Sequence, residues 1–138
     1  YGEGADPRNA TLKDSTTVSG PGYLLTNDST NNKLDLTAVS EVAIGVSAGE
    51  SSRDANLDYE TTGATVAYYP LGGMLMVAAT ASQTWTTGAT VYIASSGLAT
   101  TSSGSSAKKL GLYVGEGETT SSANGDLIPV MTAGAEIA

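Results

Sequence analysis

The stretch Thr61-Thr-Gly-Ala-Thr-Val66 decides the fold, and the same six residues recur in the same order as Thr86-Thr-Gly-Ala-Thr-Val91. Each copy continues into β-branched and aromatic residues, as Val66-Ala-Tyr-Tyr69 and Val91-Tyr-Ile-Ala94. Glycine supplies the backbone conformations of tight turns, and β-branched and aromatic side chains favour a pleated sheet. Each copy therefore predicts a turn followed by a strand. Two copies are too few for a solenoid, and we attribute the recurrence to similar turn geometry.

Short strands are expected on both sides of this repeat, because alternating apolar residues are separated by turn residues at short intervals. Residues 42–46 are predicted to place Val42, Ile44 and Val46 on the core side of a half-buried strand. Only residues 34–39 indicate a short helical turn. The spacing of the strands is typical of an all-β sandwich or small barrel. The predicted strands are residues 23–26, 42–46, 64–69, 74–79, 90–94, 109–114 and 126–131.

The composition agrees with an all-β chain that has a small core. The chain has 138 residues, 17 of them glycine, and only 6% are aromatic, with Trp85 as the single tryptophan and no phenylalanine. The core must therefore be built mainly from aliphatic side chains, and the length suits one domain. Residues 1–21 are polar and irregular, with Pro7 and Pro21 as breakers, and predict an extended N-terminal arm. Residues 22–138 are predicted to form a single β-domain.

The charge distribution argues against nucleic-acid and membrane partners. The net charge is −8, and of the six basic residues only Lys108 and Lys109 are adjacent. A phosphate backbone is bound by clustered Lys and Arg, and an anionic lipid surface repels an acidic chain. No apolar run approaches the roughly 20 residues of a spanning helix. We therefore expect no direct nucleic-acid contact and no membrane contact.

The residues that carry most enzyme chemistry are missing. The chain contains no histidine and no cysteine, which excludes histidine-based triads, Cys–His dyads and zinc sites built from imidazole or thiolate. No phosphate-binding loop or dinucleotide fingerprint is present. We therefore predict that the protein is not an enzyme and that it has no catalytic residue, cofactor or metal site.

Two acidic groups leave rival interpretations open. Residues 54–60 carry oxygen-bearing side chains at alternate positions, as at the start of a calcium-binding loop. However, Tyr59 and Thr65 stand where an EF-hand needs Gly and Glu. The second rival interpretation is a hydrolase that uses carboxylates. A solvated surface explains both acidic groups more simply than a calcium site or a hydrolase does. The carboxylates that such a hydrolase would use are Glu116, Glu118 and Asp126.

The few aromatic residues are candidates for contacts with a partner. Tyr68 and Tyr69 are neighbours on one predicted strand, so one of them points away from the core. Trp85 is either an anchor within the core or a contact to another subunit, because Trp and Tyr are enriched at interface hot spots.

Several segments share their order and spacing with a known family. Their turn and strand pattern, over residues 40–132 approximately, resembles the small capsid decoration (cement) proteins that stabilise the heads of tailed double-stranded DNA phages and related archaeal viruses. The polar insertion at residues 47–60 departs from the family pattern, and the N-terminal region lies outside it. The segments are Gly63-Ala-Thr-Val-Ala-Tyr-Tyr69, Gly73-Met-Leu-Met-Val-Ala-Ala79, Thr87-Gly-Ala-Thr-Val-Tyr-Ile-Ala-Ser-Ser-Gly-Leu-Ala-Thr100, Lys109-Leu-Gly-Leu-Tyr-Val-Gly115 and Gly125-Asp-Leu-Ile-Pro-Val-Met131.

The resemblance implies a compact β-barrel or tulip-like domain on the outer capsid surface of a virion. It further implies binding to the major capsid protein and self-association, commonly as a homotrimer. An irregular arm can become ordered by adding a strand to an exposed sheet edge of the capsid protein. The candidate residues for capsid or subunit interfaces are Tyr1, Arg8, Leu12, Tyr23, Tyr69 and Trp85.

A carbohydrate-binding or adhesin β-sandwich, as a module of a virion fibre or a cell surface, is the alternative function. Such a module needs an exposed aromatic platform for the sugar. Trp85 with Tyr92 is the one pair in the sequence that would provide it.

Overall fold

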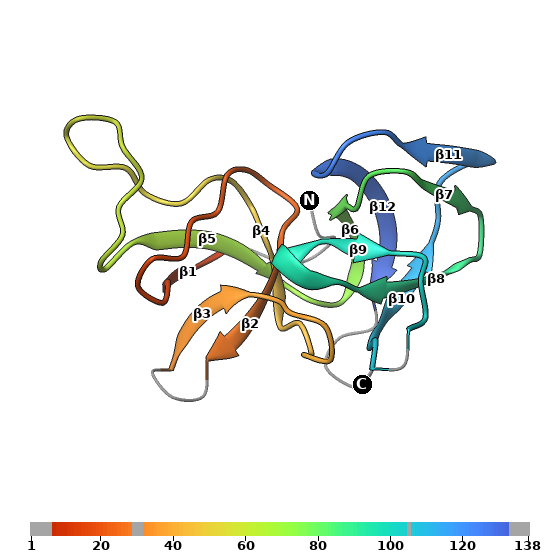
Figure 1. Ribbon diagram of the computed structural model, residues 1–138, viewed down its shortest axis with the longest axis horizontal. Helices are drawn as coiled ribbons and strands as arrows, with labels where there is room; N and C mark the ends of the chain where they lie inside the picture. The colour runs from red at the N-terminus through yellow and green to blue at the C-terminus, as the bar shows by residue number, and fades with distance from the viewer. Residues whose placement is uncertain (1–6, 29–31, 105, 133–138) are drawn as a thin grey trace.

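The computed structural model describes residues 7–28, 32–104 and 106–132, and it is all-β, as the sequence predicts (Figure 1). A 3₁₀ turn, η1 (Ser95–Gly97), is the one helical element within this part of the chain. The strands are β1 (Arg8–Thr11), β2 (Leu24–Asp28), β3 (Lys33–Leu36), β4 (Gly45–Ser47), β5 (Thr65–Pro70), β6 (Gly73–Ala79), β7 (Gln83–Thr86), β8 (Thr90–Ile93), β9 (Ala99–Thr100), β10 (Lys109–Tyr113), β11 (Glu118–Ser121) and β12 (Asp126–Thr132).

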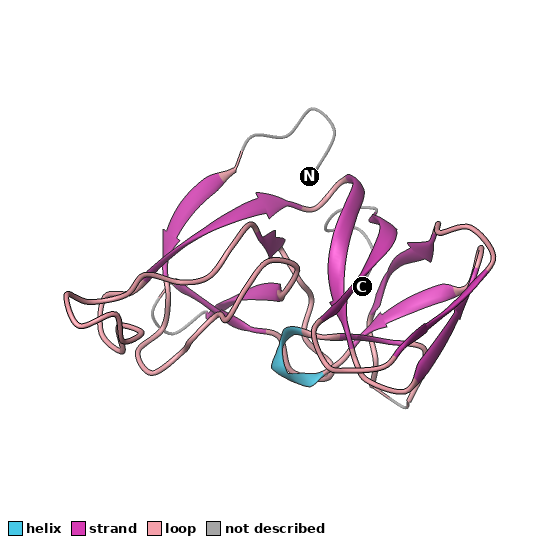
Figure 2. Cartoon of the chain, turned by 90° about the horizontal axis from the view of Figure 1, so that it is seen from above, coloured by secondary structure: helices cyan, strands magenta, loops and turns pink. Residues whose placement is uncertain are grey.

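The second half of the chain forms a closed five-stranded barrel in the order β10-β12-β6-β9-β8, which confirms the predicted small barrel. Strands β6 and β12 form its longest pair, which runs antiparallel from Asp126 opposite Ala79 to Thr132 opposite Gly73. Strands β7 and β11 pair separately, beside the barrel (Figure 1). Figure 2, coloured by secondary structure, shows the cyan helical turn η1 among the strands.

The first half of the chain forms a five-stranded sheet in the order β1-β5-β4-β2-β3. This sheet curls, because the chain just after β1 meets β3 at the opposite end of the strand order. Leu12 bridges Leu34 in parallel, and the Lys13 amide donates to the Leu34 carbonyl at 2.8 Å. The sheet and the barrel lie next to each other along the long axis of the molecule (Figure 1).

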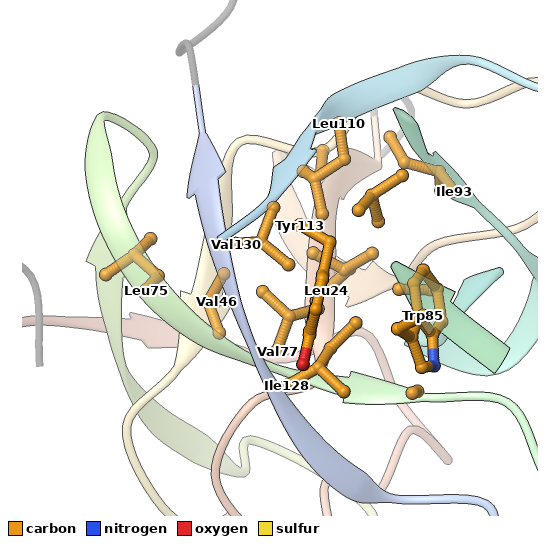
Figure 3. Close-up of a cluster of buried hydrophobic side chains, with 14 residues drawn as sticks. Leu24, Val46, Leu75, Val77, Trp85, Ile93, Leu110, Tyr113, Ile128 and Val130 are labelled. Atoms are coloured by element: carbon orange, nitrogen blue, oxygen red, sulfur yellow. The ribbon is translucent and has the colours of Figure 1, made fainter. Parts of the chain in front are cut away.

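Two hydrophobic cores lie inside these structures. The first core fills the curled sheet, and the second core fills the barrel (Figure 3). The first half of the chain also contributes Leu24, Ala43 and Val46 to the second core, so the two halves pack against each other. The first core contains Leu12, Val18, Leu25, Leu34, Ala64 and Val66. The second core contains, besides these three residues from the first half, Leu75, Val77, Ala79, Trp85, Val91, Ile93, Ala99, Leu110, Tyr113, Ile128 and Val130.

The strands predicted around the repeat are confirmed. Residues 64–69 and 90–94 correspond to β5 and β8, and each follows a glycine with positive φ, 68° at Gly63 and 87° at Gly88. The strands expected at residues 23–26, 74–79, 109–114 and 126–131 correspond to β2, β6, β10 and β12.

Two local predictions are wrong. The segment 34–39 does not form a helical turn, because Leu34 is buried in the first core and its strand β3 pairs with β2. The segment 42–46 was predicted to pack Val42, Ile44 and Val46 against one core, but its side chains are divided between the two cores. Ala43 lies in the second core, whereas Ile44 packs against the first.

The prediction of an extended N-terminal arm is also wrong for residues 7–21, the part of that segment that the structure describes. Residues 8–11 are β1, which pairs antiparallel with β5 from Arg8 opposite Tyr68 to Thr11 opposite Thr65. Leu12 and Val18 are fully buried in the first core, and burial of these side chains holds the segment in the domain. Tyr1, the first predicted contact, lies outside the described residues.

Candidate docking surfaces

An apolar face covers the outside of the barrel on the neighbouring strands β6, β12 and β10. Successive side chains of a strand point to opposite sides, so Leu75 and Val77 fill the core while Met74 and Met76 point outward. Apart from the half-buried Pro129, the members of the face are 38% to 47% exposed. We call this surface the barrel face, and its members are Met74, Met76, Leu112, Val114, Leu127, Pro129 and Met131.

The strand register places these side chains in adjoining rows. Met131 lies opposite Met74 on one side and opposite Leu112 on the other. In the next row Pro129 lies opposite Met76, and the Pro129 carbonyl accepts the Val114 amide at 3.1 Å. The face is therefore continuous across three strands, in contrast to the isolated apolar side chains common on soluble proteins.

The barrel face holds all three methionines of the chain. Methionine has an unbranched, polarizable side chain that adapts to irregular partner surfaces, and it is frequent at binding surfaces for this reason. The aromatic-poor composition gives the protein few other residues for an apolar contact. A protein partner, rather than a small polar ligand, suits such a face.

The barrel face is also free of carboxylates. The outward positions of β6, β10 and β12 carry one charged residue, the exposed Lys109 at the start of β10. Glu116 is exposed in the loop that follows the other end of β10. A basic and an acidic residue therefore flank the face at opposite ends of one strand.

A second candidate surface is the loop between β4 and β5. In Figure 1 this loop projects from the five-stranded sheet, at the end of the molecule away from the barrel. Leu57 is the most exposed large hydrophobic residue that the structure describes, at 73%, and it has a positive φ of 66°. A left-handed conformation is uncommon for a residue other than glycine and persists only where neighbouring contacts impose it.

The contacts that impose this conformation come from Arg53, Asp54 and Tyr59. The Arg53 guanidinium lies 3.9 Å from the centre of the Tyr59 ring and donates to the Leu57 carbonyl at 2.7 Å. It also donates two hydrogen bonds, at 3.0 and 3.1 Å, to the Glu50 carboxylate, which accepts a third from the Tyr59 hydroxyl at 2.9 Å. These bonds, with Arg53 first and Tyr59 second, hold the pKa of Glu50 below its usual value.

Within residues 54–60, where a calcium loop was the rival interpretation, the Asp54 carboxylate closes a turn. Its Oδ1 accepts the amides of Asn56 at 2.8 Å and Asp58 at 3.1 Å. The Asp54 carbonyl accepts the Leu57 amide at 3.0 Å, so both backbone groups of Leu57 are held. Within the described ranges, no three His, Cys, Asp or Glu side chains are grouped as metal ligands.

The interface residues proposed from the sequence are only partly available at the surface. Leu12 is fully buried, and Trp85 is fully buried as well, so neither offers a contact to a partner. The Trp85 indole donates to the Ser121 hydroxyl at 3.1 Å, and its ring packs against Tyr113 at 6.1 Å between centres. Arg8 is exposed, and Tyr23 and Tyr69 are half-buried.

Of the carboxylates in the hydrolase interpretation, Glu118 and Asp126 are separated by the length of β11. Glu118 begins β11, whereas Asp126 lies beyond its other end, where it accepts the amides of Ser122 at 2.8 Å and Ala123 at 3.0 Å. These bonds, with that from Ala123 the strongest influence, lower the pKa of Asp126 below its usual value. The Asp126 side chain therefore acts as the acceptor of a turn.

Another polar cluster lies beside the first sheet. The Lys13 ammonium is 3.7 Å from the Asp28 carboxylate and 3.8 Å from that of Asp35. Asp35 also accepts a hydrogen bond from the Thr16 hydroxyl at 3.0 Å. The single lysine pairs with both acidic groups, and the cluster is an ion-pair network within the domain.

Sequence reasoning missed the barrel face, although a signal for it was present. The segments Met74-Leu-Met-Val-Ala-Ala79 and Leu127-Ile-Pro-Val-Met131 are apolar at every position and do not alternate. A strand of this kind is usually covered on both sides. In this chain the barrel core covers the inner side of both strands, whereas the outer side, which includes Met74 and Met131, is exposed.

Comparison with known proteins assigns the chain to no family, so the two surfaces described above are the basis for proposing a function. The described part of the chain contains no helix with the length and apolar character required to cross a bilayer. No protein-family model matches the sequence, and the search of curated proteins finds no significant relative.

Proposed function

We propose that the protein is a structural decoration (cement) protein that binds the outer surface of a viral capsid and stabilises the shell without catalysing a reaction. The observation that carries the proposal is the barrel face, a continuous apolar surface on a rigid β-domain. Such a face serves protein–protein contact, and a decoration protein works through such contacts alone. The order and spacing of the sequence segments that resemble the decoration family support the same assignment.

The loop that presents Leu57 is the proposed contact to the major capsid protein. Its two ends are anchored by β4 and β5, and Arg53 holds its tip in one conformation, so little conformational entropy is lost on binding. This loop replaces the N-terminal arm as the projecting element, because residues 8–18 belong to the sheet and its core. Several copies on one lattice would then bind far more tightly than a single copy. The resemblance predicts a homotrimer there.

The carbohydrate-binding alternative loses its main support. Its aromatic platform needs Trp85 beside Tyr92 at the surface, but Trp85 is fully buried and its indole N–H is already bonded to Ser121. A sugar ring stacks on an exposed aromatic face, which Tyr92 alone, half-buried on β8, does not extend into a platform.

Purified virus particles provide the test. Quantitative mass spectrometry is expected to find this chain in a copy number that matches the capsid lattice, and antibody labelling is expected to reach it on intact particles. Particles stripped of the chain should rebind it and gain heat resistance. Leu57→Asp is expected to weaken rebinding at least tenfold, whereas Val39→Asp, at an exposed valine outside the loop and the barrel face, should rebind like wild type. Absence of the chain from particles would refute the proposal.

A further inference from the structure

We propose that the barrel face is the contact surface between two copies of this chain, and that each copy places this face against the same face of the other about a two-fold axis. The inference rests on the proposed function in treating the chain as a structural protein, and it names the partner of the barrel face. The evidence comes from the composition, the charge and the symmetry of the face.

The composition requires an apolar partner of similar extent. The side chains of Met74, Met131 and Leu112 form one row across three strands, and none of them offers a strong hydrogen-bonding group. Strands that are apolar at every position are usually covered on both sides, and the barrel core covers only one side of β6 and β12. A second barrel face supplies an equally apolar surface for the uncovered side.

The negative charge of the chain favours this face, over the rest of the surface, for contact between two copies. Each copy carries a net charge of −8, so most orientations bring carboxylates of the two copies close together. The barrel face contains no carboxylate, and two such faces can meet without removing a charged group from water. Close approach of two copies therefore costs least at this surface.

The flanking charges indicate the symmetry of the pair. Lys109 begins β10, and Glu116 lies in the loop beyond the other end of this strand, three residues after Tyr113. The five residues of the strand span about 13 Å, at about 3.3 Å per residue. A two-fold axis that lies in the plane of the interface and crosses the strands at the middle of the face reverses the strand direction in the second copy. Lys109 of each copy then lies near Glu116 of the other, which forms two equivalent ion pairs at the rim.

A contact of this kind has a definite stoichiometry. A face that packs against itself is isologous, and it closes after two copies. A trimer needs a heterologous contact between two different surfaces, so the homotrimer that the resemblance predicts would have to form elsewhere on the chain. The mass of the assembly in solution therefore discriminates between the two arrangements.

The test measures the mass of the full chain in solution by sedimentation velocity and light scattering between about 1 and 200 μM, a range that brackets moderate affinities. The expected species has the mass of two chains. Met131→Glu, in the centre of the first row, is expected to weaken the pair at least tenfold. Leu57→Glu, which removes the most exposed apolar side chain outside the face, should leave the mass unchanged. Because Met131 points outward, thermal melting should show that the Met131→Glu variant remains folded.

A charge exchange tests the two-fold axis itself. Lys109→Glu alone and Glu116→Lys alone are each expected to weaken the pair two- to fivefold at low salt, and the double exchange should restore it. Wild-type protein offers a check without substitutions, because oxidation of the three methionines by hydrogen peroxide should slow as the protein concentration rises.

Three results would overturn the inference: a monomer at every concentration, a mass of three chains, or a pair that Met131→Glu leaves unaltered. These outcomes do not depend on virus particles. A monomeric chain that is found on particles therefore refutes only the two-fold contact. A dimeric chain that is absent from particles refutes only the proposed function.

Discussion

Leu24 and Leu25 are consecutive residues of β2, both fully buried, yet their side chains lie in different hydrophobic cores. Strand β2 separates the interior of the curled sheet from the interior of the barrel, because neighbouring side chains of a strand point to opposite sides. Strand β2 therefore couples the two halves of the molecule, together with Ala43 and Val46, which also lie in the barrel core.

This coupling predicts one cooperative unfolding transition. Leu24→Ala and Leu25→Ala are each expected to lower the free energy of unfolding by about 2–5 kcal/mol, the usual cost of truncating a buried leucine. Trp85 lies in the second core and reports on it by fluorescence in urea titrations. Leu25→Ala changes only the first core, so a shift of the Trp85 transition to lower urea indicates coupled halves. An unchanged Trp85 transition in this variant would mean that the barrel unfolds independently.

The close approach of β10 to β12 predicts a strict requirement for glycine at position 111. A Cβ atom added at Gly111 would overlap the Met131 carbonyl oxygen, which belongs to the backbone and cannot rotate away. Gly111→Ala is expected to lower the free energy of unfolding by about 1–3 kcal/mol, as overpacking does. Gly104→Ala is the control, because nothing lies within 4 Å of an added Cβ there. Equal melting temperatures for the two variants would contradict the strand spacing.

The loop that carries Leu57 is predicted to depend on the shape of the Arg53 guanidinium rather than on its charge. Arg53→Lys keeps the positive charge but loses the paired N–H donors to Glu50 and the planar stack on Tyr59. Hydrogen exchange at the Leu57 amide should become several-fold faster, while the midpoint of global urea unfolding stays unchanged, because surface ion pairs add little to global stability. Arg8→Lys, at an exposed arginine on β1, should leave this exchange rate unchanged.

The sequence predicted those strands that carry both an apolar pattern and a glycine turn, such as β5 after Gly63 and β8 after Gly88. It did not predict β1, because Arg8-Asn-Ala-Thr11 is polar and lies in the sheet through its backbone pairing with β5. The burial of Leu12 and Val18 depends on residues far along the chain, which a local pattern does not contain. The prediction of a free arm failed for that reason.

The candidate site was harder to predict than the fold. Trp85 was a reasonable interface candidate by residue type, but its indole lies beside Ser121, 36 residues later in the sequence. The barrel face requires the register of β6 against β12, which places Met74 next to Met131. Residue types alone do not specify that register. They did show that both strand segments are apolar on both sides, and this is the property of the barrel face that can be predicted from the sequence.

Asp126 predicts a specific dependence of stability on pH. Its carboxylate accepts the amides of Ala123 and Ser122, and its pKa in the folded protein is therefore lower than the value of about 3.9 expected in the unfolded chain. The carboxylate's contribution to stability is consequently complete above the unfolded-state pKa and is lost as the pH falls through the folded-state pKa. Asp126→Asn should be less stable than wild type at pH 7.

The difference between wild type and Asp126→Asn should shrink as the pH falls below about 4, because the wild-type carboxyl group then takes up a proton and binds the two amides less strongly. Urea unfolding at a series of pH values measures this difference directly. Glu118→Gln, at an exposed carboxylate on β11, serves as the matched control and should show no such convergence. A constant difference between wild type and Asp126→Asn from pH 7 to pH 2 would show that the hydrogen bonds of the turn do not depend on the charge of Asp126.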